Sequence, residues 1–211
     1  MDSTPIIQEA VKVLREGGVI LYPTDTVWGI GCDATNEKAV ARVFEIKRRS
    51  EAKSLVLLAC DLDMVAKYIK ESPSIAIDLV EVNDAPMTII YPGAQYLAPN
   101  AVAEDGSVGI RIPLVEEEEA DPEAPRKTAP KGNLTAGAFC RELVRRLRRP
   151  LVSTSANISG EPTPATFAEI PEEIKAAVDY VVPKPFGVGA TGRSSQIIKL
   201  GLGGEVEILR P

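Results

Sequence analysis

The sequence predicts a single α/β domain with a twisted, mixed β-sheet and flanking helices. Short runs of β-branched residues alternate with amphipathic helical patterns along the whole chain. The 211 residues suffice for one well-buried domain, and they contain no internal repeat. Because the predicted strands and helices interleave, we expect residues 1–211 to share one sheet.

Eight segments are expected to form strands, because each is a short run rich in β-branched and other apolar residues. They are Val19–Tyr22, Leu55–Leu58, Thr88–Tyr91, Val108–Ile112, Leu151–Ser153, Tyr180–Val182, Ile197–Leu200 and Val206–Leu209. Five segments have helical periodicity. They are Ile6–Glu16, Glu37–Arg48, Asp61–Ile69, Ser74–Val82 and Phe139–Arg148.

Local signals mark several helix ends. Gly17 and Gly18 form a typical helix stop, and Asn36 is a candidate N-cap. Thr166 and Glu169 have the spacing of a capping box, and Pro171 limits that helix to a short piece. Residues 115–135 are rich in Glu, Pro and Lys, so we expect a flexible acidic insertion between a strand and a helix.

Composition excludes several functional classes. The chain has no histidine, which removes His-based triads, His metal sites and imidazole bases. The net charge of −6 makes nucleic acid a poor first choice of ligand, so we expect weak or indirect contact with it. No apolar run reaches the roughly 18 residues of a membrane span, and no signal-peptide pattern is present. We expect a cytoplasmic protein with no membrane partner.

The three cysteines are odd in number and far apart, at positions 32, 60 and 140. This spacing fits neither a disulfide framework nor a zinc ribbon, so buried free thiols are expected. No metal is assigned to protein side chains.

Tyr22–Gly31 is the first candidate site segment, with Thr24 and Thr26 next to glycines at the end of a predicted strand. Hydroxyls and free N–H groups there suit a carboxylate or phosphate, although an ordinary capped turn also fits. Lys47, Arg49 and Lys53 form a basic cluster near a helix C-terminus. The helix dipole explains such a cluster, and so does a bound triphosphate.

Hydroxyl and amide side chains follow another predicted strand, over Ser153–Gly160. Buried hydroxyls and amides need hydrogen-bond partners, so this density favours a ligand site. Arg111 lies between apolar residues, where it either pairs with a buried acid or receives an anionic ligand. Gly192–Gln196 is a polar turn that could close over a nucleotide. A second basic cluster, Arg145–Arg149, is interpreted as a solvated helix face.

Five motifs together resemble the YrdC-like family of threonylcarbamoyl-adenylate synthases. They are Tyr-Pro-Thr-x-Thr-Val-x-Gly from Tyr22, Lys-x-Arg-x-x-x-Lys from Lys47, Pro-x-Thr from Pro86, Gly-Ile-Arg-Ile-Pro from Gly109, and Ser-Thr-Ser-Ala-Asn-x-Ser-Gly from Ser153. The similarity extends from about residue 6 to residue 198. The chain contains neither a P-loop nor a G-x-G-x-x-G turn. The resemblance implies a nucleotide enzyme without either of these motifs. It would have a YrdC-like fold in its short single-domain form.

The resemblance also implies a reaction. L-threonine and bicarbonate give N-carboxythreonine, whose carboxylate attacks the α-phosphate of ATP. Threonylcarbamoyl-adenylate and pyrophosphate result, and a separate complex transfers the threonylcarbamoyl group to tRNA. Mg²⁺ is expected with ATP. Such a reaction depends on alignment and charge neutralisation and needs no protein nucleophile, so no catalytic residue is assigned.

Site residues follow from the same resemblance. Threonine and bicarbonate are expected at Thr24, Thr26, Thr88, Arg111 and Ser155. ATP is expected at Lys47, Arg49, Lys53, Ser153, Asn157, Arg193 and Ser195. The chain departs from the family where Asn83–Ala85 replaces Trp-Pro-Gly before Pro86, and where Leu58 replaces a histidine found in some members. Two alternatives are a non-catalytic RNA-binding module of this fold and an inactive paralogue.

Overall fold

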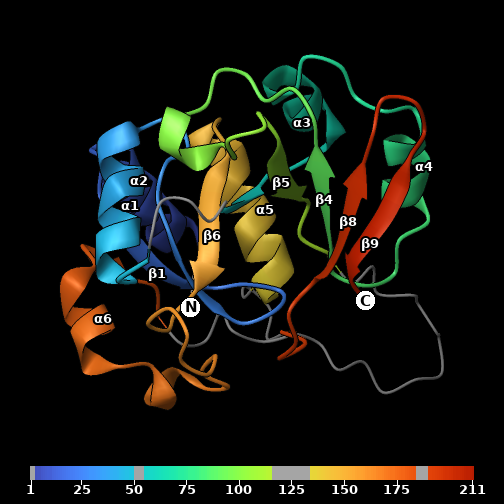
Figure 1. The fold of residues 1–211 in the computed structure, drawn as a ribbon. Coiled ribbons are helices and arrows are strands. Elements are labelled where there is room, and N and C mark those ends of the chain that lie inside the picture. The colour runs from blue at the N-terminus through green and yellow to red at the C-terminus, as the bar shows by residue number, and fades with distance from the viewer. Residues whose placement is uncertain (1–2, 50–54, 116–133, 184–189) are drawn as a thin grey trace, which may run out of the picture.

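The computed structural model describes residues 3–49, 55–115, 134–183 and 190–211 (Figure 1). Its α-helices are α1 (Ser3–Arg15), α2 (Glu37–Ile46), α3 (Leu62–Tyr68), α4 (Ile75–Glu81), α5 (Ala136–Leu147) and α6 (Glu172–Ala177). Its strands are β1 (Ile20–Pro23), β2 (Trp28–Gly31), β3 (Val56–Leu58), β4 (Met87–Tyr91), β5 (Val108–Arg111), β6 (Leu151–Ser155), β7 (Tyr180–Val181), β8 (Gln196–Leu200) and β9 (Val206–Arg210). Short 3₁₀ helices cover Pro99–Ala101 and Phe167–Glu169.

The strands of the described chain form one mixed sheet in the order β7-β1-β2-β6-β3-β5-β4-β8-β9. The pairs β1–β7, β3–β5 and β4–β8 are parallel, and the other neighbouring pairs are antiparallel. The predicted α/β fold with a mixed sheet is therefore confirmed. In this order, segments far apart in the sequence become neighbours, with β6 between β2 and β3.

One face of the sheet is apolar along most of its width. Side chains alternate between the two faces of a strand, so Leu21, Ile30, Leu57, Val152 and Ile110 all point to this face. Helix α2 packs on it through Val40, Val43 and Phe44, and α3, α4 and α6 each add a buried residue. These residues form the larger core cluster.

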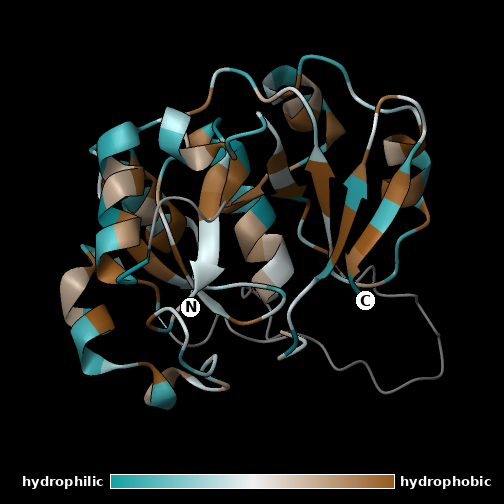
Figure 2. Cartoon of the chain, in the orientation of Figure 1, coloured by the Kyte–Doolittle hydropathy of each residue, from teal (hydrophilic) through white to brown (hydrophobic). Residues whose placement is uncertain are grey.

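The opposite face is divided between a second core and a polar surface. Helices α1 and α5 contact one another and cover Ile20, Tyr22, Leu58 and Leu151. Beyond these helices, hydroxyl, glycine and arginine residues point the same way, among apolar side chains such as Val56 and Ile90. In Figure 2, β6 changes from hydrophobic at its start to near-neutral toward its end, as Leu151 and Val152 give way to three hydroxyl residues.

The largest difference from prediction is β2. The stretch Trp28–Gly31 was expected as a glycine-containing turn, and it forms a strand that pairs with β1 and β6. Gly29 and Gly31 permit this pairing, because a Cβ at Gly31 would lie 2.3 Å from the carbonyl oxygen of Val152. Glycine occurs here because the neighbouring strand is so close. Its low strand propensity is why the sequence pattern did not predict a strand.

Helix boundaries differ from prediction for local reasons. Helix α5 begins at Ala136, three residues before the predicted start, because the Thr135 hydroxyl accepts a hydrogen bond from the Ala138 N–H at 3.3 Å. The predicted Asn36 cap of α2 is confirmed, with its side chain accepting from the Ala39 N–H. At the predicted capping box, Glu169 accepts from the Thr166 hydroxyl, but Thr166 caps no backbone N–H. Helix α6 was not predicted.

Cys32, Cys60 and Cys140 are buried free thiols, as the sequence predicted. Across the described ranges, every helix is too short or too polar to cross a bilayer. The predicted acidic insertion, residues 115–135, falls almost entirely outside the described residues.

Gly137 provides a test of how tightly α5 packs against the chain after β5. A Cβ at this position would lie 1.7 Å from the carbonyl oxygen of Leu114. We expect Gly137→Ala to lower the free energy of unfolding by about 1–3 kcal/mol, as overpacking does. An ordinary helix glycine would instead gain up to about 1 kcal/mol from the same change. Urea denaturation distinguishes the two, and a stabilised variant would contradict the contact.

Candidate active site

A hydrogen-bonded hairpin loop, Thr24–Val27, joins β1 to β2. The Thr24 hydroxyl donates to the Val27 carbonyl at 2.7 Å and accepts from the N–H groups of Thr26 and Val27. The Thr26 hydroxyl lies 2.8 Å from that of Thr24. The Thr24 hydroxyl therefore stabilises the conformation of the loop, and the Thr26 hydroxyl lies next to that of Thr24. Both side chains are buried.

Arg111 at the end of β5 lies deep in the site. Its side chain is 4% exposed and forms an ion pair with Asp25, which is 5% exposed. The second carboxylate oxygen of Asp25 accepts from the Leu114 N–H at 3.0 Å. Of the two interpretations of Arg111, pairing with a buried acid is confirmed, and the pairing leaves part of the guanidinium facing the cavity described below.

Helix α2 ends in a turn that directs Arg49 toward the sheet. Arg48 takes a left-handed φ of 50°, its N–H bonds to the Glu45 carbonyl, and the Arg49 N–H bonds to the Phe44 carbonyl. This pattern is a Schellman motif, which usually has glycine where Arg48 stands. Burial lowers the pKa of Arg49 from its ordinary value.

Lys47, two residues earlier, points into the protein. Its side-chain nitrogen donates to the Ser155 carbonyl at 2.5 Å and to the Asn157 carbonyl at 2.7 Å. Its own carbonyl accepts from the Ser159 N–H at 2.9 Å. Lys47 is 2% exposed, and burial, assisted by the charge of Arg49, lowers its pKa to about 8. It joins α2 to the turn after β6.

These elements surround a cavity of about 300 Å³ on the polar face of the sheet. Every second residue of the central strands points into it, including Thr88 and Ile90 of β4, and Gly109 and Arg111 of β5. The complete lining is Thr24, Thr26, Val27, Gly29, Arg49, Leu55, Val56, Thr88, Ile90, Gly109, Arg111, Ser153, Thr154, Ser155, Ser194, Ser195, Ile197 and Arg210.

The structure brings most of the predicted site residues together. Those that line the cavity are Thr24, Thr26, Arg49, Thr88, Arg111, Ser153, Ser155 and Ser195. The hydroxyls of Thr88 and Ser195 lie 2.8 Å apart, which joins β4 to β8. Lys53 falls outside the described residues, so its predicted role remains a prediction.

Three predicted residues do not line the cavity. Lys47 is directed to carbonyls behind it, and Arg193 is exposed. The Asn157 amide nitrogen donates to the Ile158 and Glu161 carbonyls, whereas its side-chain oxygen is buried with no hydrogen-bond partner in the described chain. Most buried side-chain acceptors have a donor, so this oxygen is unusual in the part of the chain that the structure describes.

Sequence reasoning missed two charged residues of the site. Arg210 reaches the cavity from β9 and donates to the Ser195 carbonyl at 2.8 Å, and burial lowers its pKa. No local signal distinguished it from other arginines, because only the pairing of β9 with β8 brings it there. Asp25 was passed over because it sits within a threonine-rich loop that reads as a turn.

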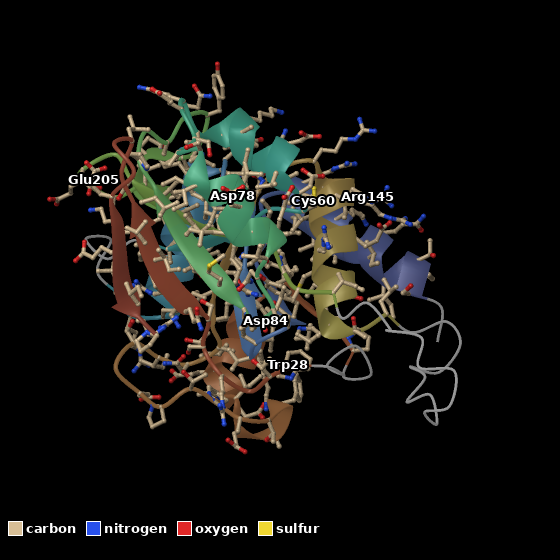
Figure 3. The ribbon with its side chains drawn as sticks, turned by 90° about the vertical axis from the view of Figure 1, so that its right-hand side faces the viewer. Trp28, Cys60, Asp78, Asp84, Arg145 and Glu205 are labelled. Atoms are coloured by element: carbon tan, nitrogen blue, oxygen red, sulfur yellow. The ribbon has the colours of Figure 1, made fainter. Side chains whose placement is uncertain are left out.

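No acidic residue lines the cavity among the described residues, and no described group of three or more Asp, Glu or Cys could hold a metal ion. The Arg145–Arg149 cluster lies elsewhere. Figure 3 shows Arg145 on α5, above Trp28, which follows the hairpin loop, and none of the cluster's arginines lines the cavity. Arg145 and Arg146 both pair with Glu142, and Arg149 pairs with Asp33.

The protein is an α/β domain whose mixed sheet carries one cavity lined by three arginines and several hydroxyls. Such a domain is suited to a small anionic ligand. A family model, Sua5/YciO/YrdC, described as "Telomere recombination", matches residues 12–116 and 133–211. The chain belongs to this family.

Its curated relatives include two proteins named threonylcarbamoyl-AMP synthase. The one from Xanthomonas euvesicatoria pv. vesicatoria is 31% identical over 208 residues, covering 94% of this chain and 100% of the relative. The one from Xanthomonas campestris pv. campestris is 33% identical over 192 residues, covering 89% and 90%. That name denotes an enzyme of the nucleotidyltransferase type, and the chain is an enzyme of this class.

Solved structures agree on the fold. P. abyssi Sua5 complexed with L-threonine is 25% identical with a TM-score of 0.74, over 92% of this chain and 50% of that one. This chain thus spans about half the length of Sua5. E. coli YciO, at 21% identity, has a TM-score of 0.71 over 98% of this chain and 88% of its own.

The lowered pKa of Lys47 predicts a pH-dependent contribution to stability. Between its folded pKa of about 8 and its ordinary 10.5, the unfolded state holds a proton that the folded state has lost. Raising the pH through this window therefore favours folding, by at most about 1.4 kcal/mol per pH unit. We expect the unfolding free energy of the wild type to rise relative to Lys47→Met between pH 8 and 10 in urea titrations. A constant difference would show that the pKa is ordinary.

Proposed function

We propose that this enzyme makes threonylcarbamoyl-adenylate from L-threonine, bicarbonate and ATP, with release of pyrophosphate, for threonylcarbamoyladenosine modification of tRNA. The observation that supports this best is that Arg49, Arg111 and the hydroxyls of β6 line one cavity. The names of the curated relatives and the threonine complex of Sua5 support the same reaction. The proposal places the enzyme in the cytoplasm, upstream of a separate tRNA-transfer complex.

The lining residues divide into two groups under this proposal. Arg49, Arg210 and Ser194 bind the triphosphate, because guanidinium groups and hydroxyls are good donors to phosphate oxygens. Thr26, Thr88 and Arg111 bind threonine, with Arg111 at its carboxylate. Ser153 and Ser155 lie on β6 within the same cavity, where they contact the reacting groups.

Catalysis then consists of alignment and charge stabilisation. Neutralising the triphosphate lets a carboxylate approach the α-phosphate, and the arginines oppose the charge that develops in the transition state. Holding both reactants in a near-attack geometry can lower the barrier by about 7–11 kcal/mol. A protein nucleophile or histidine base is unnecessary for such an attack.

Mg²⁺ would enter as part of the ATP complex. The described cavity wall offers hydroxyls and arginines, which bind phosphates and are poor primary ligands for Mg²⁺. The phosphates themselves supply the oxygen ligands that Mg²⁺ prefers. The cavity of about 300 Å³ is at the low end for ligand sites, so the adenosine would extend toward its open side.

A non-catalytic RNA-binding module has less support. Its basic surface would be the Arg145–Arg149 cluster, but three of those arginines pair with Glu142 or Asp33. Such pairing reduces the field available to a phosphate backbone. An inactive paralogue also fits poorly, because the cavity retains its arginines and hydroxyls.

Pyrophosphate release tests the proposed function. The purified protein with Mg²⁺ and ATP should release pyrophosphate only when both threonine and bicarbonate are present, because the attacking group is a carboxylate made from the two. A coupled pyrophosphatase assay follows the release, and serine in place of threonine measures selectivity. Release that ignores either substrate would rule out the reaction.

Adjacent arginines provide a matched pair of variants for the ATP subsite. Arg49 lines the cavity, whereas Arg48 pairs with Glu173 on the surface. We expect Arg49→Ala to lower kcat/KM for ATP about 100-fold, the loss typical of removing a donor to transition-state charge. Arg48→Ala should change it less than about twofold, since exposed ion pairs contribute little. Equal effects in steady-state kinetics would refute the assignment of Arg49.

A further inference from the structure

Asp25, next to the cavity, is held by contacts from several elements. One carboxylate oxygen pairs with Arg111 and the other accepts from the Leu114 N–H. Its backbone carbonyl accepts from the Thr191 N–H at 2.9 Å. Its Cβ lies 3.5 Å from the position that a Cβ on Gly137 would occupy. The hairpin loop, β5, α5 and the segment before Ser194 therefore all meet at this residue.

Neighbouring contacts fix the backbone around Asp25. The Cys140 thiol of α5 donates to the Pro23 carbonyl at 3.3 Å, and the Gly192 N–H donates to the Thr26 carbonyl at 2.8 Å. The carboxylate therefore has little freedom of its own. The arginine that it pairs with has correspondingly little freedom.

We infer that Asp25 is a positioning residue, which orients the Arg111 guanidinium so that its free N–H groups receive the substrate carboxylate. Asp25 acts through Arg111 and does not line the cavity itself. This inference rests on the proposed function, in which Arg111 binds the carboxylate.

Two physical arguments favour positioning over simple stabilisation. A buried ion pair is weak evidence for stability, because desolvation of both charges offsets most of their attraction. An acid beside an anion-binding arginine also reduces its net charge, which lowers affinity for anions in general. Orientation of Arg111 explains why the acid is present. A planar guanidinium binds a carboxylate well only when the N–H groups along one edge of the guanidinium face the carboxylate.

Asp33 offers a matched control for the same substitution. It is 1% exposed, pairs with Arg149 through one oxygen and accepts from Thr35 through the other. Neither Asp33 nor Arg149 lines the cavity. Asp25→Asn and Asp33→Asn therefore both remove a buried carboxylate from an arginine, but only the first does so at the site.

Threonine binding by calorimetry and pyrophosphate kinetics, run on the wild type and both variants, test the inference. We expect Asp25→Asn to weaken threonine binding and raise the threonine KM at least about tenfold, because the lost bond involves two charged groups. Its KM for ATP should stay within about twofold. Asp33→Asn should leave both KM values unchanged, even if both variants melt at lower temperature.

Unchanged threonine affinity in a folded Asp25→Asn variant would overturn the inference, and so would an equal rise in both KM values. If Asp25→Asn does not fold, the double variant Asp25→Leu/Arg111→Met removes the pair without leaving an unpaired charge. It should fold and fail to bind threonine, and retained binding would refute the role of the pair. A wild type that binds threonine but releases no pyrophosphate would refute the proposed function alone, whereas one that does not bind threonine would overturn both the proposed function and this inference.

Discussion

Buried positive charge is the constraint on which this site depends. Arg111 and Lys47 are both nearly inaccessible to water, and a buried cation is tolerated only with internal partners. Arg111 has the Asp25 carboxylate, and Lys47 has two backbone carbonyls. The two solutions differ in consequence. The Asp25 carboxylate fixes the direction of the Arg111 guanidinium, which still faces the cavity. The two carbonyls instead hold the Lys47 ammonium away from the cavity, where it links α2 to the turn after β6.

The mixed sheet makes such an arrangement possible. It places β6 between β2 and β3, so the hydroxyls that follow Val152 lie beside the hairpin loop, although about 130 residues separate them in the chain. Because α1 and α5 cover only part of one face, the same alternation that builds the core elsewhere directs Thr88, Arg111 and Ser153 into an open cavity. The core and the site thus both follow from the alternation of side chains along the strands. The parts of the sheet that helices cover become core, and the uncovered part becomes the cavity.

Sequence reasoning identified the strands and most cavity residues because both have local signatures. Runs such as Met87–Tyr91 are β-branched and apolar, and Ser153–Ser155 is too polar for a core strand. It missed β2, because Gly29 and Gly31 are poor strand formers. Glycine is needed there because the backbone of β6 lies too close for a side chain, which the local sequence does not show. Sequence reasoning grouped Lys47 with Arg49, although the turn at Arg48 sends them in different directions. Arg210 could not be found, because its position depends on a distant strand pairing.

Under the proposed function, the two ends of the cavity differ in charge, and this difference orients the substrates. Arg111 shares its charge with Asp25, so its surroundings are close to neutral and suit a single carboxylate. Arg49 lines the cavity from α2 and Arg210 from β9, and for both the lowered pKa has desolvation as its cause. Two arginines bring more positive charge to a triphosphate than the single Arg111, whose charge a carboxylate offsets. A polyanion is thus favoured at Arg49 and Arg210 and disfavoured beside Asp25, which keeps the carboxylate subsite available for the smaller substrate.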